Sequence, residues 1–154
     1  MNLPRQTYAT AANYAAEQEI SEVFAGVAKQ AQLKVGVDDP KKMKPSIDRL
    51  LHKNGVVTCF FEVKQCPRHG FGPSEGPAEG WTTGQRKTHK LRALYELVRV
   101  PVLYVVRFNG GTIARVSVMK PYTVDKIFGR SDRGDSADFE GGTRWPWEAF
   151  TVIQ

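Results

Sequence analysis

A short turn between two apolar segments is the feature of this 154-residue chain that most constrains its fold. Lys53-Asn54-Gly55 separates the segment Ser46–His52 from Val56–Lys64, which is rich in β-branched and aromatic residues. Asn-Gly accepts the positive φ angles of a tight hairpin turn, and the composition of Val56–Lys64 is typical of a strand. The sequence therefore predicts an antiparallel hairpin that brings residues on either side of the turn together.

Helices and further strands are predicted on both sides of the hairpin. With residues spaced about 100° apart around a helix, Ala11–Gln32 places its apolar side chains on one face and predicts a helix. A second helix is expected from Gly84 to Val98, capped by Thr82 or Thr83. The remaining predictions are strands at Pro101–Phe108 and Thr112–Met119, a mobile loop at Gln65–Gly80, a flexible connection at Arg130–Thr143, and a C-terminus docked through Trp145, Trp147 and Phe150. This order predicts a single α/β domain, residues 1–154, with a mixed central sheet flanked by helices.

Composition places the chain among soluble globular proteins, with 41% hydrophobic and 25% charged residues. Neither a signal peptide nor an apolar run of about 20 residues is found, so the prediction is a cytoplasmic protein that contacts no membrane. Cys59 lies in the apolar strand segment, and a buried free thiol is favoured there over a disulfide with Cys66. Cys66 and His69 alone do not make a zinc site.

The net charge of +6 is concentrated in the middle of the chain, because residues 33–109 carry 14 basic and 7 acidic side chains. A basic surface attracts phosphate backbones without reading sequence. From charge alone, a surface that only keeps the protein soluble is as good an explanation as one that binds nucleic acid. The side chains expected to hold a nucleic acid lie in the loop before the hairpin and in the first turns of the second helix, where free N–H groups also favour anions: Lys41, Lys42, Lys44, Arg86, Lys87 and Lys90.

Two carboxylates and a lysine meet at the predicted hairpin. Asp48 lies in the first strand, and in the second strand Glu62 and Lys64 share one face because side chains alternate. Two close carboxylates repel each other and need a cation, and oxygen ligands suit Mg²⁺ or Mn²⁺. Lys64 can orient a water or stabilise charge on a phosphate. A Glu-x-Lys spacing by itself more often marks a strand leaving the core for solvent.

The order of these pieces over residues 11–108 resembles the PD-(D/E)XK nuclease superfamily, most of all its archaeal Holliday-junction resolvases and virus-type replication–repair nucleases. Ala16-Glu17-Gln18-Glu19-Ile20 resembles the opening helix motif, Phe61-Glu62-Val63-Lys64 the central motif, and Thr83-Gly84-Gln85-Arg86 the glutamine-bearing segment. One departure concerns Asp48, which follows Pro45-Ser46-Ile47 where the family has Pro or a nearby Gly. The resemblance implies a restriction-endonuclease-like core over about residues 11–119, with residues 120–154 as a C-terminal extension.

The resemblance also assigns roles. It implies that Asp48, Glu62 and the Val63 carbonyl hold Mg²⁺ or Mn²⁺, that Lys64 positions the nucleophile, and that Gln85 joins the site, although the helical wheel turns Gln85 away from the apolar face. One glutamate of the first helix completes the set by binding a second ion or its water. Glu17 borders the apolar face whereas Glu19 points away from it, so Glu17 is preferred and Glu19 remains the alternative.

These observations favour a metal-dependent DNA endonuclease, and the resemblance favours branched DNA, a Holliday junction or a flap, in replication, recombination or repair. A homodimer and a phage origin are consistent with the same resemblance. The main alternative is a non-catalytic nucleic-acid-binding module with a degenerate site. A basic interaction domain with an accidental Glu-x-Lys is a third reading. RNA as substrate stays open.

Overall fold

The computed structural model describes residues 11–35, 47–129 and 139–154. Among these residues no helix is both long and apolar enough to cross a membrane. The elements follow one another as α1 (Ala11–Ala28), β1 (Ala31–Lys34), β2 (Arg49–Lys53), β3 (Val56–Cys66), β4 (Trp81–Gly84), α2 (Gln85–Val98), β5 (Val102–Phe108), β6 (Ile113–Ser117), β7 (Thr123–Gly129), β8 (Phe139–Trp145), the 3-10 helix η2 (Trp147–Ala149) and β9 (Thr151–Val152).

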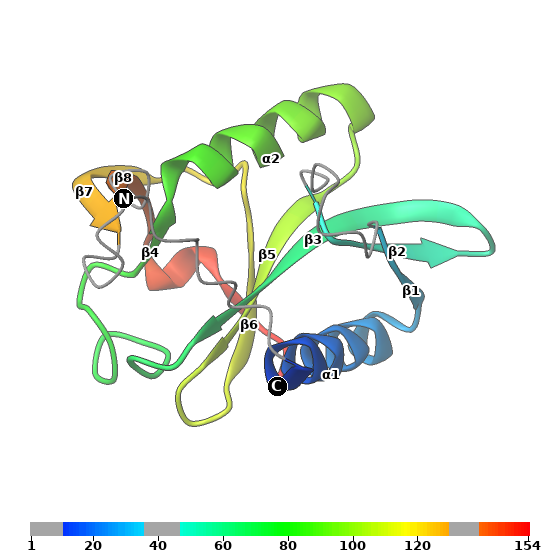
Figure 1. The fold of residues 1–154 in the computed structure, drawn as a ribbon, viewed down its shortest axis with the longest axis horizontal. Coiled ribbons are helices and arrows are strands. Elements are labelled where there is room, and N and C mark those ends of the chain that lie inside the picture. Colours follow the sequence, from blue (N-terminus) through cyan, green and yellow to red (C-terminus); the bar gives the residue numbers. More distant parts are fainter. Residues whose placement is uncertain (1–10, 36–46, 130–138) are drawn as a thin grey trace, which may run out of the picture.

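Six strands form one mixed sheet in the order β1-β2-β3-β5-β6-β9. β3 and β5 run parallel, and the other neighbouring pairs are antiparallel. Parallel strands need a crossover connection, and α2 lies within the one that joins β3 to β5. The two helices lie on opposite faces of this sheet (Figure 1). The predicted α/β domain with a mixed, helix-flanked sheet is confirmed.

The face of the sheet toward α1 is packed with apolar side chains. Phe61 of β3 meets Phe24 of α1 edge to face, with ring centroids 5.0 Å apart. The buried members of this cluster are Ile20, Phe24, Ala25, Leu51, Cys59, Phe61, Val63, Leu103, Val105 and Ile113. Since side chains alternate along a strand, Glu62 and Lys64 share the opposite face of β3, as the sequence predicted, and this face is turned toward α2.

The α2 side is covered by a second, three-stranded antiparallel sheet in the order β4-β8-β7. Its core is strongly aromatic: Trp145 of β8 is fully buried and its ring contacts those of Trp81 and Tyr104. Trp147 and Phe150 pack beside them, so the predicted docking of the C-terminus is confirmed. Residues 120–154 thus supply strands to both sheets, since β9 pairs with β6.

The hairpin between β2 and β3 has the predicted turn. Asn54 and Gly55 both have positive φ angles, 54° and 78°, as a two-residue hairpin turn with the strand twist requires. Arg49 pairs with Phe61 in this ladder. One position further along the same register, Asp48 lies beside Glu62.

Three predicted boundaries are wrong. The first helix ends at Ala28, four residues before Gln32, because Lys29 takes a left-handed φ of 54° and the chain continues as β1. Thr82 and Thr83 belong to β4, and the N-cap of α2 is Gly84, without a side-chain hydrogen bond. The first predicted strand begins at Arg49; Ser46 lies outside the described residues.

Two segments predicted as loops are more ordered than expected. Of Arg130–Thr143, the part from Phe139 is strand β8, because β4 and β7 give it hydrogen-bonding partners on both sides. Gln65 and Cys66 still belong to β3, and the irregular segment after them is attached to the core. Phe71 packs against Trp147 with ring centroids 5.0 Å apart, so the predicted loop is present at residues 67–80 and is packed against the core.

Candidate active site

Glu62 lies at the centre of the candidate site. It occupies the middle of β3 opposite Tyr104 of the parallel strand β5, and only 6% of its surface is exposed. Its Oε2 atom is buried and has no hydrogen-bond partner among the described residues. A carboxylate oxygen left without a hydrogen bond in a buried site is costly unless a cation meets it.

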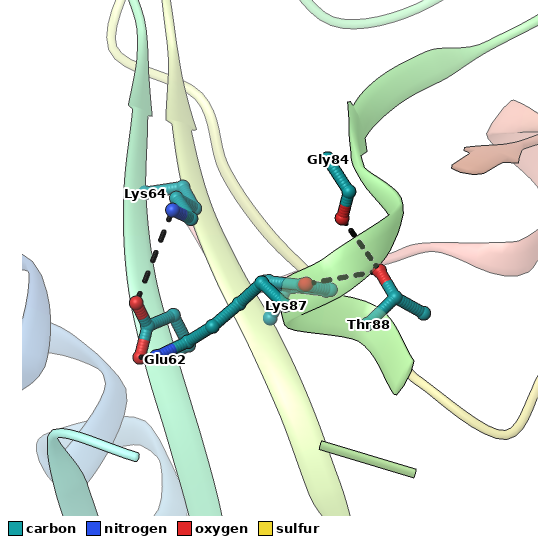
Figure 2. Close-up of polar contacts among 6 residues, drawn as sticks. Glu62, Lys64, Gly84, Lys87 and Thr88 are labelled. Atoms are coloured by element: carbon teal, nitrogen blue, oxygen red, sulfur yellow. Dashed lines mark hydrogen bonds and ion pairs between the residues drawn. The ribbon is translucent and has the colours of Figure 1, made fainter. Parts of the chain in front are cut away.

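Two lysines face this carboxylate from different elements. Lys64 Nζ, from the same strand, is 3.9 Å from Glu62 Oε1. Lys87 Nζ, from α2, is 3.4 Å from Glu62 Oε2. Figure 2 shows the two amino groups approaching the carboxylate from the strand and from the helix. The sequence predicted that Lys64 lies on the same face as Glu62, but it predicted that Lys87 binds the DNA backbone. No local pattern reveals which strand residue a crossover helix will contact.

The electrostatics of Glu62 are those of an acid that lacks enough positive charge. Burial raises the pKa of Glu62 from 4.5 to about 7, while the charges of Lys64 and Lys87 act to lower it. Repulsion from the neighbouring Asp48 carboxylate raises the pKa further. Two ionised carboxylates this close repel each other, and a cation bound between them would relieve that repulsion.

Glu17 of α1 is the third carboxylate of the cluster. Burial raises its pKa, repulsion from Asp48 adds to the rise, and the charges of Arg49, Lys64 and Lys34 oppose it. Glu19, the alternative, is 70% exposed and pairs with Arg107 at 3.6 Å. The structure therefore brings Glu17, and not Glu19, into the electrostatic neighbourhood of Asp48 and Lys64.

The donors present suit a hard divalent cation. Asp48 and Glu62 offer carboxylate oxygens, the ligands that Mg²⁺ and Mn²⁺ prefer, and Glu62 Oε2 is the buried oxygen without a hydrogen bond. Among the described side chains, no group of three His, Cys, Asp or Glu converges closely enough to hold one ion. Two carboxylates completed by waters and a phosphate are the usual arrangement for Mg²⁺. Val63 has its side chain buried on the α1 face and is paired through its backbone with Val105.

A buried hydroxyl network anchors the helix that carries Lys87. Thr88 Oγ1 donates to or accepts from Tyr104 Oη at 3.1 Å and Thr143 Oγ1 at 2.9 Å, and it lies 3.3 Å from the Gly84 carbonyl. Thr143 Oγ1 in turn lies 3.3 Å from the Thr83 carbonyl, to which it donates. This network joins α2 to β5 and β8 within one turn of Lys87. No local sequence pattern predicts this network, because its members come from three distant segments.

The other predicted site residues lie around this centre or outside the described chain. Gln85 Nε2 is 3.3 Å from His89 Nε2, and its amide oxygen lies where a side chain on Gly141 of β8 would begin. Its contacts are therefore on the β8 side of α2. Arg86 and Lys90 are exposed on α2. Lys41, Lys42 and Lys44 fall in residues 36–46, outside the part of the chain that the structure describes.

The two cysteines take no part in this cluster. Both are buried and free, as predicted for Cys59, whose pKa is raised to about 12 mainly by burial. Cys66 belongs to the aromatic core cluster, and its Sγ lies 3.5 Å from His69 Nε2.

Comparison with known proteins identifies the family. The family model described as "Phage putative PDDEXK endonuclease" matches residues 3–153, and the chain therefore belongs to this family. Its core is accordingly the restriction-endonuclease-like fold of PD-(D/E)XK nucleases, as the resemblance implied. Among solved structures, the chain is similar to Hjc, a Holliday junction resolvase from the archaeal hyperthermophile Archaeoglobus fulgidus. The two share 10% identity with a TM-score of 0.46 over 68% of this chain and 76% of that one. No curated protein matches the chain.

Proposed function

We propose that this chain is a Mg²⁺- or Mn²⁺-dependent DNA endonuclease whose centre is Glu62. The observation that carries the proposal is the buried carboxylate of Glu62, which faces the amino groups of Lys64 and Lys87 and feels the repulsion of the Asp48 carboxylate. A purely structural ion pair would not gather further negative charge around an acid that burial already disfavours.

The roles follow from the chemistry of each group. Asp48, Glu62 and the Val63 carbonyl would hold the cation, and Glu17 would bind a second ion or its water. The bound ion supplies positive charge that offsets the developing charge on the phosphate and makes water a better nucleophile. Lys64, on the same strand face as Glu62, orients that water and donates hydrogen bonds toward the reacting phosphate.

DNA is held by the basic middle of the chain. Arg86 and Lys90 are exposed on α2, on the helix that also brings Lys87 to Glu62. We propose that this helix, together with Lys41, Lys42 and Lys44, binds the phosphate backbone of the DNA. We further propose branched DNA as the substrate, cut by a homodimer, because a four-way junction offers two equivalent strands to two symmetric sites. A phage enzyme of this kind would act in the host cytoplasm.

The test is cleavage of linear, flapped and four-way-junction DNA with Mg²⁺ or Mn²⁺. Lys64→Ala should lower turnover by at least about a hundredfold, because it removes a group that acts on the reacting phosphate. Lys53→Ala, which removes an exposed lysine at the hairpin turn, is the matched control and should cleave as wild type does. EDTA should stop cleavage by all active variants.

Two outcomes would contradict the proposal. Equal cleavage by wild type and Lys64→Ala would show that Lys64 has no role in the reaction. DNA binding that survives EDTA, with no cleavage of any substrate by any metal, would instead support the non-catalytic binding module. Preference for the branched substrates is read from the same panel, and the dimer from the molar mass in solution with and without a four-way junction.

A further inference from the structure

Lys87 has a position that holding a DNA backbone does not explain. Its amino group lies 3.4 Å from Glu62 Oε2, and its side chain is only 27% exposed. Lys90, one turn further along the same helix, is exposed to solvent. A lysine that serves only to attract phosphate gains nothing from being turned inward onto a buried carboxylate, where its charge is already neutralised.

The position of Lys87 is imposed by the fold. Thr88, the next residue, is fully buried and is held by Tyr104 and Thr143 through their hydroxyl groups. These contacts fix the rotation of α2 about its axis, so that Lys87 points toward β3. Figure 2 shows the side chain of Lys87 reaching Glu62, while Thr88, the next residue, turns away from it and contacts Gly84.

Lys87 approaches Glu62 Oε2, which is also the oxygen best placed to coordinate a divalent cation. Glu62 Oε2 is buried and makes no hydrogen bond to any described residue, whereas Oε1 faces Lys64. An ammonium group and a divalent cation cannot occupy the same side of one carboxylate oxygen, because their charges repel over a few ångströms in a site of low dielectric. The amino group of Lys87 must therefore move when such an ion is bound, and the flexible four-carbon stem of lysine allows that movement.

We propose that Lys87 is a second active-site lysine, which neutralises Glu62 in the ion-free protein and contacts the reacting phosphate once Glu62 is engaged by a divalent cation. This inference rests on the proposed function. In the ion-free protein Lys87 keeps a buried acid from being left without charge compensation. On displacement from Glu62 it stands beside the phosphate, to which it donates a hydrogen bond as negative charge develops there.

Lys87→Met tests the inference, because methionine keeps much of the stem and removes the charge. Two effects of opposite direction are expected. The affinity of the DNA-free protein for Mn²⁺ or Ca²⁺, measured by calorimetry, should rise about three- to tenfold because a competing charge is gone. The kcat for cleavage of the DNA substrate should fall on the order of a hundredfold with little change in KM, because a contact made in the transition state is lost.

Three further variants separate this role from simpler ones. Lys90→Met shows the effect of losing a lysine that only binds DNA. It should raise KM while leaving the affinity for the divalent ion unchanged. Lys53→Met, at the exposed hairpin, should alter neither quantity. Lys87→Arg keeps the charge and should restore part of the lost kcat and the wild-type ion affinity. It also keeps the test open if Lys87→Met is poorly folded by circular dichroism.

The inference is overturned if Lys87→Met binds the ion as wild type does, or if it behaves as Lys90→Met does and changes KM alone. In either case wild type still cleaves DNA and the proposed function stands. A wild-type protein that cleaves none of the DNA substrates would overturn both the proposed function and the role of Lys87 that depends on it.

Discussion

Glu62 is an acid whose protonation depends on what surrounds it. The strand buries it, two lysines partly compensate its charge, and Asp48 works against them. Burial dominates this balance, so the ion-free site is short of positive charge at neutral pH. This imbalance makes the ionised Glu62 carboxylate a cost to the stability of the ion-free fold, and the cation of the proposed function would offset that cost.

A dependence of stability on pH follows from this imbalance. Burial raises the pKa of folded Glu62 to about 7, so between pH 4.5 and 7 the folded state holds a proton that the unfolded state has lost. The free energy of unfolding of the ion-free protein should therefore fall as pH rises through this range. Glu62→Gln removes this contribution and should become more stable than wild type toward neutral pH, by roughly 3 kcal/mol at 1.36 kcal/mol per pKa unit.

Urea denaturation in EDTA, at intervals from about pH 4.5 to 8, measures this difference. The two proteins should be closest in stability at the acid end, where Glu62 is neutral in both states. Mg²⁺ added at the alkaline end should stabilise wild type and leave Glu62→Gln unchanged. A stability difference that does not vary with pH would contradict the raised pKa.

The positions of some of these side chains could be predicted from the sequence, and those of others could not. Glu62 and Lys64 could be found because strand alternation places them together, and Glu17 because it borders the apolar face of its helix. Lys87 could be named as basic, but its contact with Glu62 depends on how a crossover helix is rotated against a strand more than 20 residues earlier. That rotation is set by the hydroxyls of Thr88, Tyr104 and Thr143, which look like ordinary interior residues in the sequence.

At the scale of elements, α2 connects the chemistry to the second sheet. Thr88→Val preserves the shape of the side chain but removes the hydroxyl that meets Tyr104 and Thr143. We expect a loss of about 1–3 kcal/mol in the free energy of unfolding, because buried polar partners lose a hydrogen bond. We also expect a lower kcat, since α2 carries Lys87.

The measurements are urea denaturation and cleavage of the preferred DNA substrate. Thr151→Val is the matched control, because Thr151 is exposed in strand β9 and should tolerate the same change at little cost. If both variants unfold at the same urea concentration as wild type, the network does not anchor the helix.

The elements themselves were predictable where their pattern is local. The β2–β3 hairpin has an Asn-Gly turn, and β5 begins with the continuous apolar run Val102–Val106. The predicted helix wrongly includes Ala31 and Gln32, the first half of β1, because a strand of four residues carries little periodic signal. β8 contains Gly141 and Gly142, which weaken a strand in isolation, and its ladder comes from β4, some 60 residues away in sequence.

The whole molecule combines a net charge of +6 with a carboxylate centre. An acidic cluster repels DNA, so the surrounding basic side chains must supply the attraction. We expect the affinity for any duplex, measured by fluorescence anisotropy in EDTA, to fall at least about a hundredfold between roughly 50 and 200 mM salt, as release of several counterions requires. Duplexes of different sequence should show the same dependence of affinity on salt concentration. An affinity that does not change with salt would refute this backbone-dominated mode of binding.

The parallel pairing of β3 with β5, and the anchoring of α2 by Thr143, have a consequence for how the enzyme is made. The β2–β3 hairpin is local and can form as soon as it leaves the ribosome, whereas contacts between distant segments close later. Glu62 is therefore synthesised early, but Lys87 is fixed in place only after β8 has emerged near the end of the chain. A nascent or truncated product that ends before Thr143 therefore has Glu62 in its strand but lacks one of the two side-chain contacts that hold Lys87 beside it.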